Sequence, residues 1–388
     1  MKKVKVVHII TRMIIGGAQE NTLLTVLGLQ KDARYEVSLI TGMEKGPEGR
    51  LELEDVENPI FESSLVRNLH PIKDIICLIK LFLFFRKNKF DIVHTHSSKA
   101  GVIGRIAAFI ARVPVIIHTI HGLSFHSYQS MIQNKLFIFL EKICAIFTTR
   151  IITVADEMQI KCLKSGIGKK EQFITIYSGM KLEEFKSAYS LREDVRRKLN
   201  VSDKAFIIGK VARLFPLKGH KYILNIAEDL VKRYPQIVFV FVGNGILFDS
   251  FSKKIKARGL NKHFIFTGLV DPARIPEYLS SFDILVHTSL REGLARVLPQ
   301  AGAVGVPVIS FDIDGAKEVI KDGETGFLVE PENECELKEK IIELINNYDL
   351  RVKFMNNLRQ RLEPYFSHKY MVREIEEVYR FELQKIKL

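Results

Sequence analysis

The strongest constraint on this chain is a regular alternation of short apolar runs with longer amphipathic segments. Runs such as Val4–Thr11, Val115–Thr119 and Ile237–Val242 are rich in β-branched and other apolar residues. They predict strands buried on both faces, and the segments of helical period between them predict parallel sheets covered by helices. Further strands are expected at Tyr35–Ile40, Phe90–Thr95, Arg150–Val154, Phe206–Ala212, Phe264–Thr267, Ile284–Thr288, Pro307–Ser310 and Gly326–Val329.

The alternation lapses after Tyr177-Ser178-Gly179, where a charged stretch predicts a connection with one helix, and it resumes at Phe206. A chain of 388 residues, 47% of them hydrophobic, suits two cores better than one. We therefore predict the α/β class, with two Rossmann-like, doubly wound parallel-sheet domains that face each other across a cleft. The expected boundaries are residues 1–185 for the N-terminal domain, 186–204 for a linker, 205–365 for the C-terminal domain and 366–388 for a last helical segment.

The sequence favours a cytoplasmic protein that does not cross a bilayer. The N-terminus, Lys2-Lys3-Val4-Lys5, has no apolar signal-peptide stretch. The most apolar windows, residues 75–85 and 137–147, are interrupted by charged residues and are too short for a membrane span.

The formal charge of +13 is concentrated in residues 65–186, which hold 18 Lys and Arg against 8 Asp and Glu. Basic residues there alternate with apolar runs at 72–89 and 134–150, a pattern that favours an anionic membrane surface. Ordinary solvated helix faces would give the same pattern, and this alternative stays open. Nucleic acid is not expected as a partner, because the basic region lacks interleaved aromatic residues.

Three loops of the N-terminal half follow predicted strands and carry polar or glycine residues. Gly16-Gly17 would let the backbone approach a phosphate or sugar hydroxyl at a helix start. His94 and His96 point the same way on a strand, which could suit a metal, but no third ligand is evident, so no metal or other cofactor is expected. His121 follows the strand Val115–Thr119.

Loops of the C-terminal half have the residues of a diphosphate and polyol site. Arg213 and Lys218 flank a strand end and a helix start, where two cations could clamp a diphosphate. Glu292 could accept hydroxyl protons, while the N–H groups of Gly293 and Leu294 donate at an expected helix start. Gln300 would then lie about two turns along the same helix face. Ordinary turn chemistry remains the alternative for the loop with Arg213 and Lys218, for Gly243-Asn244-Gly245 and for Phe266–Val270, a candidate apolar slot.

Together these motifs resemble family 4 of the retaining glycosyltransferases, with the two-domain arrangement called GT-B. The resemblance spans nearly the whole chain. Its motifs are Gly16-Gly17, "DIVHTH" at 91–96, "HG" at 121–122, "VARL" and "KG" within 211–219, "EG" at 292–293 and "AVGVPVISFDIDGAKEVIKDGETGFLV" at 303–329.

The resemblance implies roles for the matching positions. Arg213 and Lys218 would hold the donor diphosphate, Glu292 would accept hydroxyls of the donor sugar, and His121 would face that sugar. The family usually has a second glutamate where this chain has Gln300, which implies altered ribose recognition. The expected site is therefore catalytic His121, Glu292, Arg213 and Lys218; donor-binding Gly17, Gly243, Leu269, Gly293, Leu294, Val297 and Gln300; acceptor-binding Gly16, His96 and Lys99; and no metal.

The implied function is metal-independent, retaining transfer of a sugar from a UDP- or GDP-sugar to a glycan or polyprenyl-linked acceptor in cell-surface polysaccharide synthesis. Residues 1–185 would bind the acceptor, 205–365 the nucleotide sugar, and the last helix would pack back on the first domain. The basic apolar helices suggest peripheral association with the inner face of the membrane. The alternatives are a nucleotide-sugar epimerase or hydrolase on the same fold, and a non-catalytic nucleotide-sugar binder.

Overall fold

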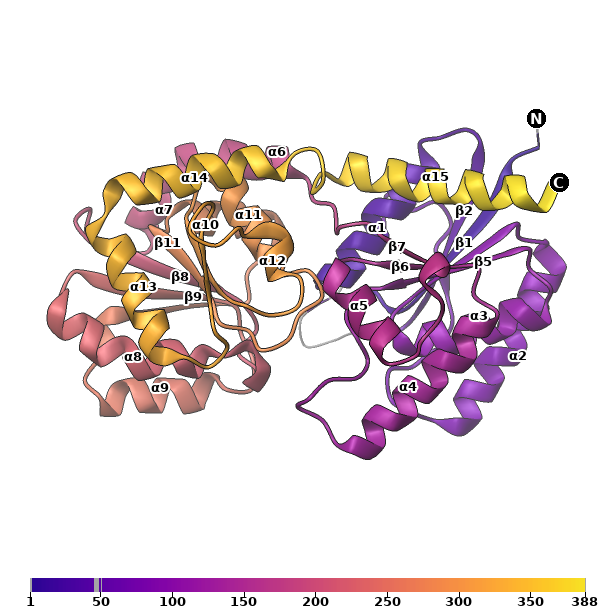
Figure 1. Ribbon diagram of the computed structural model, residues 1–388, viewed down its shortest axis with the longest axis horizontal. Helices are drawn as coiled ribbons and strands as arrows, with labels where there is room; N and C mark the ends of the chain where they lie inside the picture. The colour runs from indigo at the N-terminus through magenta and orange to yellow at the C-terminus, as the bar shows by residue number, and fades with distance from the viewer. Residues whose placement is uncertain (1, 45–48, 50, 388) are drawn as a thin grey trace. The chain divides into compact units, whose positions relative to one another are not determined.

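The computed structural model describes residues 2–44, 49 and 51–387, which form two compact units (Figure 1). Unit 1 contains the described residues up to Gly179 together with those from His368 onward, and unit 2 runs from Met180 to Ser367. The chain therefore leaves the first unit after Gly179, builds the second, and returns to the first for its last helix.

Unit 1 is built on a seven-stranded parallel sheet with the strand order β3-β2-β1-β4-β5-β6-β7. The apolar runs of the sequence are its central strands, and the two short strands β3 and β7 are additions that the sequence pattern did not predict. The strands are β1 (Val4–Arg12), β2 (Tyr35–Gly42), β3 (Ile60–Phe61), β4 (Ile92–His96), β5 (Val115–Ile120), β6 (Arg150–Thr153) and β7 (Phe173–Thr175).

Helices cover both faces of this sheet. The core on one face joins strand residues to helices α1 and α15, and the core on the other face joins them to α2 and α3. Local sequence signals determine where some helices start. Pro71 is the first residue of α2 and follows the capping residue His70, and the Ser130 hydroxyl caps α4. The helices are α1 (Gly17–Gln30), α2 (Pro71–Asn88), α3 (Ser98–Ile110), α4 (Met131–Ile146), α5 (Asp156–Lys164) and α15 (His368–Lys387).

Helix α15 is integrated into unit 1 although it comes from the far end of the sequence. It packs beside α1 and buries Met371, Ile375 and Tyr379 (Figure 1). Gly28 of α1 makes this close approach possible, because a Cβ there would lie 2.6 Å from the Val372 side chain.

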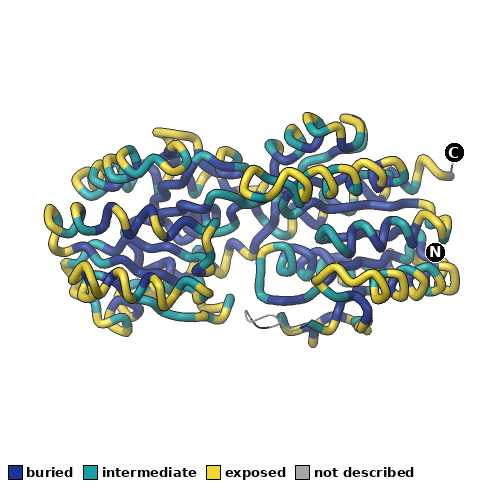
Figure 2. The backbone as a smooth tube through the Cα atoms, turned by 90° about the horizontal axis from the view of Figure 1, so that it is seen from below, coloured by how far each residue is buried: buried dark blue, intermediate teal, exposed yellow. Residues whose placement is uncertain are grey.

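Unit 2 repeats the architecture with a six-stranded parallel sheet, ordered β10-β9-β8-β11-β12-β13. Figure 2 shows the strands of both units as largely buried, with the exposed residues on the outer sides of the helices. Its strands are β8 (Phe206–Val211), β9 (Ile237–Val242), β10 (Phe264–Gly268), β11 (Ile284–His287), β12 (Val308–Phe311) and β13 (Phe327–Val329).

The main core of unit 2 joins its sheet to α8, α9, α13 and α14. At β8 the sheet also packs tightly on Phe282, since a Cβ on Gly209 would lie 1.9 Å from that ring. The helices are α6 (Leu182–Lys186), α7 (Arg192–Lys198), α8 (His220–Arg233), α9 (Phe248–Ala257), α10 (Ile275–Ser280), α11 (Val297–Val304), α12 (Ala316–Val319), α13 (Glu334–Asn346) and α14 (Tyr348–Leu362).

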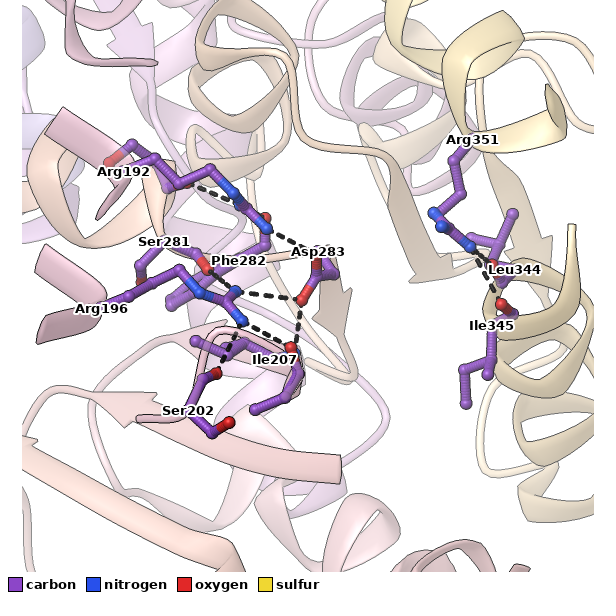
Figure 3. A network of polar contacts seen from close by, with 12 residues as sticks. Arg192, Arg196, Ser202, Ile207, Ser281, Phe282, Asp283, Leu344, Ile345 and Arg351 are labelled. Carbon is purple, nitrogen blue, oxygen red and sulfur yellow. Dashed lines mark hydrogen bonds and ion pairs between the residues drawn. The ribbon is translucent and has the colours of Figure 1, made fainter. Parts of the chain in front are cut away.

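Residues 186–204, expected as a linker, are built into unit 2. Arg192 and Arg196 of α7 donate hydrogen bonds to backbone carbonyls just before β11 and form ion pairs with Asp283 (Figure 3). The Asp283 carboxylate also accepts a hydrogen bond from the backbone N–H of Ile207 in β8. The boundary accordingly lies at Gly179 and Met180 rather than after residue 185. Two of the charges in this stretch, Arg192 and Arg196, bind one carboxylate, and the charged stretch after Gly179 contains two α-helices, α6 and α7, instead of the one expected.

Among the described residues, no helix is both long enough and apolar enough to span a membrane.

Replacing Ile375 by Ala should destabilise unit 1 by about 2–4 kcal/mol, because it empties a fully packed position of α15. Urea unfolding measures the loss, and hydrogen exchange should show faster opening of unit 1 amides with unit 2 amides unchanged. The control is Ile386→Ala, at an exposed position of the same helix. Equal effects of the two substitutions would contradict the packing described here.

Candidate active site

The two sheets share a feature that locates their ligand sites. In unit 1 the connections run in opposite directions from neighbouring strands β1 and β4, and in unit 2 from β8 and β11. In doubly wound sheets, ligands bind beyond the carboxyl ends of the strands at such a switch point. The loops singled out in the sequence follow these strands.

In unit 2, loops from three strands are bonded to one another. The backbone N–H of Leu290, after β11, donates to Leu217 O after β8 (2.8 Å), and the N–H of Leu214 donates to Asn244 O after β9 (3.0 Å). The Thr288 hydroxyl donates to Gly219 O (2.8 Å). The expected donor-site loops therefore form one surface at the sheet edge.

Two glycines are required for this convergence. Gly219 has φ 68°, and a Cβ there would lie 1.8 Å from Thr288 O. Gly243 has φ 134°, and a Cβ there would lie 2.3 Å from Ala212 O. At both positions φ is positive and a backbone oxygen lies too close for a Cβ. Both the backbone conformation and the lack of space therefore exclude any residue except glycine.

Lys218 and Glu292 form the charged centre of this surface. The Lys218 Nζ and a Glu292 carboxylate oxygen are 2.5 Å apart, and His287 Nε2 is 3.6 Å from the same oxygen. Burial disfavours the charge on Glu292, but Lys218 and His287 outweigh it and hold the pKa of the carboxyl well below its ordinary value. Glu292 is therefore ionised at neutral pH and accepts hydrogen bonds rather than donating a proton.

The loop after β12 holds the backbone of Glu292 and Gly293 in place through two hydrogen bonds. Asp314 accepts a hydrogen bond from the Glu292 backbone N–H (2.8 Å), and Gly315 N–H donates to Gly293 O (3.2 Å). This fixes the backbone of the Glu292-Gly293 pair without help from a helix.

The helix expected to start at Gly293 starts four residues later, at Val297. Glu292 and Gln300 are therefore not two turns apart on one helix, and the prediction that they share a helix face was wrong. Gly293 and Leu294 are buried in the connecting loop, whereas Val297 and Gln300 lie in the first turn of α11.

The remaining expected donor residues lie at the same edge. Arg213 is exposed, with its guanidinium 4.9 Å from the centre of the Phe215 ring. Leu269 is half exposed directly after β10, next to Gly268, whose carbonyl accepts from the Gly243 N–H (3.1 Å).

Beneath this edge lies a buried amine that sequence reasoning missed. Lys210 of β8 is 1% exposed, and its Nζ donates to the Thr288 hydroxyl (3.0 Å), which links β8 to β11 across the switch point. Burial, aided by nearby Lys218 and opposed by Glu292, lowers the pKa of Lys210 to about 7.

In unit 1, His121 lines a cavity of about 250 Å³ beyond the end of β5. Three residues at helix starts also line it. Ala18 lies in the first turn of α1, Ser98 begins α3, and Ser97 is the cap of α3. Gly16 is the cap of α1, and Gly17 is its first residue. Helix N-termini present unpaired N–H groups, so this cavity suits a phosphate or a hydroxyl.

A second cavity of about 500 Å³ shares Ser97, Ser98 and Glu141 with the first. Its basic lining residues are Arg12, Arg67 and Lys99, and Lys99 forms an ion pair with Asp74 (2.5 Å). The apolar lining residues are Leu69, Val102, Ile103, Phe137 and Leu140.

His96, expected to bind the acceptor, is buried instead. Its ring nitrogens bond His8 and His121, each at 3.0 Å, so it contacts the lining residue His121 rather than either cavity. No sequence motif pointed to His8, which lies opposite His94 on the neighbouring strand.

His8, His94 and His96 have ring nitrogens within 4.8 Å of one another, a spacing compatible with a metal ion. Every one of their six ring nitrogens already has a hydrogen-bond partner. His8 is thus the third histidine beside His94 and His96, where the sequence analysis found no third ligand.

Two parallel-sheet units with these loop sites define the GT-B class of glycosyltransferases, and the chain belongs to glycosyltransferase family 4. Residues 15–184 match the family described as Glycosyltransferase Family 4, and residues 192–361 match Glycosyl transferases group 1. The resemblance found in the sequence and the expected fold class are thereby confirmed.

Two relatives align with most of this chain. The UDP-Gal:alpha-D-GlcNAc-diphosphoundecaprenol alpha-1,3-galactosyltransferase of Escherichia coli is 30% identical over 97% of both chains. The capsular polysaccharide biosynthesis glycosyltransferase CapM of Staphylococcus aureus is 29% identical over 84% of this chain and 87% of its own.

Solved structures agree on the fold. Anabaena Alr3699/HepE in complex with UDP-glucose matches with a TM-score of 0.81 at 23% identity, covering 96% of this chain and 98% of that one. Sucrose-phosphate synthase from Thermosynechococcus elongatus matches with a TM-score of 0.83 at 18% identity, covering 99% and 100%.

Replacing Lys210 by Met should change how stability depends on pH. The ordinary pKa of 10.5 applies to the unfolded chain and about 7 to the folded one, so between these values the unfolded state binds more protons. Wild-type stability should therefore rise from pH 7 to pH 10.5 relative to the variant, whatever the fixed effect of losing the Thr288 bond. Urea midpoints at one-unit pH intervals measure this.

The control is Lys253→Met on the exposed side of α9. Its stability difference from wild type should stay flat over the same pH range. A flat difference for Lys210→Met as well would mean that Lys210 does not titrate as described.

Proposed function

We propose that this protein transfers a sugar from a nucleotide diphosphate sugar to a hydroxyl of a lipid-linked saccharide, with retention of the anomeric configuration and without a metal ion. The observation that carries the proposal is the Lys218–Glu292 centre at the switch point of unit 2, with Arg213 in the same loop. Unit 2 binds the donor in this proposal, and unit 1 binds the acceptor and contributes His121.

Arg213 and Lys218 have the charge and position to bind a diphosphate. As the bond to the anomeric carbon breaks, negative charge develops on the leaving diphosphate. Cations fixed beforehand stabilise that charge more effectively than water does, because they do not reorganise during the reaction. This positive charge is also the reason for proposing that no divalent metal is required.

Glu292 acts on the sugar rather than on the leaving group. Its carboxylate is ionised and already oriented by Lys218 and by the backbone contact to Asp314. It can accept hydrogen bonds from two sugar hydroxyls, while it is a poor proton donor. We propose that a leaving diphosphate oxygen takes the acceptor proton on the same face of the sugar, which retains the configuration.

UDP-sugars are the first donors to test, because the Escherichia coli relative is a UDP-Gal transferase. That relative acts on a diphosphoundecaprenol-linked GlcNAc. The larger cavity of unit 1 combines basic lining residues, Arg12, Arg67 and the Asp74-paired Lys99, which could bind an anionic group, with the apolar Leu69, Phe137 and Leu140.

Helices α2 and α4 extend this apolar character to the surface. They expose large apolar side chains that the core of unit 1 does not use, together with basic residues such as Lys73, Arg86 and Lys135. Exposed apolar side chains interspersed with basic ones are typical of helices that lie on an anionic membrane. The exposed apolar residues are Ile72, Ile75, Ile76, Ile79, Leu83, Met131, Ile132, Leu136, Phe139, Ile143 and Ile146.

Replacing Arg213 by Ala should lower kcat roughly 100- to 1000-fold, because it removes one fixed cation from the leaving group. The assay combines UDP- and GDP-sugars with a synthetic polyprenyl-diphosphate-linked N-acetylglucosamine. Product NMR gives the anomeric configuration, and EDTA should leave the wild-type rate unchanged.

Arg233→Ala is the matched control, since Arg233 is also exposed with its guanidinium over an aromatic ring. Near-normal turnover by Arg213→Ala would remove this residue from the mechanism. Sugar release without acceptor would favour a hydrolase, and an inverted product or loss of activity in EDTA would contradict the proposed chemistry.

The protein should co-sediment with vesicles that contain anionic phospholipid, and less so at high salt, because salt screens the basic residues. Ile132 and Ile146 of α4 are 81% and 82% exposed. Replacing both by Ser should lower partitioning at least about tenfold, since a fully buried isoleucine side chain contributes roughly 1.5–3 kcal/mol.

Ile386→Ser, at an exposed position of α15, should bind vesicles like wild type. Equal binding by the double variant and wild type, or indifference of the wild-type protein to anionic lipid, would exclude α4 as the membrane-facing surface.

A further inference from the structure

Behind His121, unit 1 buries a cluster of three histidines and one tyrosine from three separate elements. His8 comes from β1, His94 and His96 from β4, and Tyr379 from α15, and each is at most 1% exposed. The parallel register of β1 and β4 sets His8 against His94 and Ile10 against His96. Side chains alternate along a strand, so these histidines share the sheet face that α15 covers.

The cluster forms one continuous chain of hydrogen bonds that ends at His121. The Tyr379 hydroxyl is 2.6 Å from His94 Nδ1 and 3.3 Å from His8 Nε2. His8 Nδ1 is 3.0 Å from His96 Nε2, and His96 Nδ1 is 3.0 Å from His121 Nε2. At the other end, His94 Nε2 is 2.7 Å from the Thr119 hydroxyl.

Burial keeps the interior members of this chain uncharged. It lowers the pKa of His8 to about 3 and the pKa values of His94 and His96 well below the ordinary value. It also raises the pKa of Tyr379 well above the ordinary value. Each buried imidazole therefore carries a single proton, and one nitrogen donates while the other accepts.

This restriction leaves only two consistent arrangements of protons. In one, Tyr379 donates to His94 and accepts from His8 Nε2, so that His8 accepts from His96 and His96 accepts from His121 Nε2. In the other, every one of these bonds is reversed, and His121 carries its proton on Nδ1. The single hydroxyl proton of Tyr379 selects between them.

The distances favour the first arrangement. A separation of 2.6 Å fits a donating hydroxyl, whereas 3.3 Å fits a weaker N–H donation to the phenol oxygen. His94 Nε2 then carries a proton and donates to the Thr119 hydroxyl, and the 2.7 Å separation of these atoms allows either direction of this bond.

We propose that Tyr379 of the C-terminal helix is a positioning residue that sets the tautomer and orientation of His121 through His8 and His96. The proton of His121 is then held on Nε2, which leaves the lone pair of this imidazole on Nδ1. No bond is made or broken in the chain; its effect is to fix which nitrogen of His121 can donate. A group that fixes a histidine tautomer from behind can contribute strongly to catalysis although it never touches substrate.

The tautomers are directly measurable in the unmodified protein. ¹⁵N NMR of histidine-labelled, chelator-treated protein distinguishes protonated from unprotonated ring nitrogens. We expect His8 and His96 to be neutral, and a proton on Nε2 of His8, His96 and His121. In Tyr379→Phe, His8 Nε2 loses its partner, so the Nδ1–H form of His121 should become populated.

The matched control is Tyr35→Phe. Tyr35 is buried with its ring edge-on to Tyr379, at a centroid separation of 6.3 Å, and its hydroxyl is not a member of the chain. It should leave all three tautomers unchanged. An unaltered His121 in Tyr379→Phe, a wild-type His121 with its proton on Nδ1, or shifts that report metal coordination would overturn the proposal.

The activity readout rests on the proposed transferase function, whereas the NMR readout does not. Tyr379→Phe should lower kcat at least about tenfold while the KM for the donor stays within about twofold. Tyr35→Phe should retain wild-type kcat. Changed tautomers with unchanged kcat would refute the positioning role, and absence of transfer in wild type itself would refute the proposed function while leaving the tautomer result valid.

Discussion

The candidate sites of both units depend on the geometry of the parallel sheet. Parallel strands end at the same edge, so the loops that follow them must meet there, and helix N-termini gather beside them. Where the connections reverse, between β1 and β4 and between β8 and β11, no helix crosses the edge directly and a ligand site opens. Both units use this opening, unit 1 for the cavity beside His121 and unit 2 for the Lys218–Glu292 centre.

The electrostatics of unit 2 follow from that arrangement. Lys210, Lys218 and Glu292 come from different loops or strands and are partly or fully removed from water. Each would be costly to bury alone, and their proximity offsets part of the cost. The surrounding groups offset only part of the free-energy cost of burying the charged form of Lys210, as the lowered pKa of this residue indicates. An anionic ligand at this edge would supply the missing negative charge, which is consistent with a glycosyltransferase that binds a diphosphate.

Unit 1 places many large apolar side chains on its surface as well as in its cores. Its two cores are complete with α1, α2, α3 and α15, yet α2 and α4 carry a second set of large apolar side chains that face outward. A surface of this kind is unfavourable in water and is usually explained by a partner. The same unit uses the opposite sheet face, under α15, for its buried histidines.

The sequence by itself determined all described strands except the short β3 and β7, the two-domain plan and the loops that hold Arg213, Lys218, Glu292 and His121. These features follow from local periodicity and from residues adjacent in the chain. Such local signals do not depend on the tertiary structure. It could not determine that α7 is part of unit 2, because the Asp283 that binds Arg192 and Arg196 lies some 90 positions away.

Only the tertiary structure decided which side chains meet across elements. Tyr379 reaches His8 over a separation of 371 residues, and this contact depends on strand order, on register and on which helix covers which face. The later start of α11 and the burial of Lys210 and His96 are of the same kind. Such contacts arise from packing between distant segments, and periodicity within one segment contains no information about them.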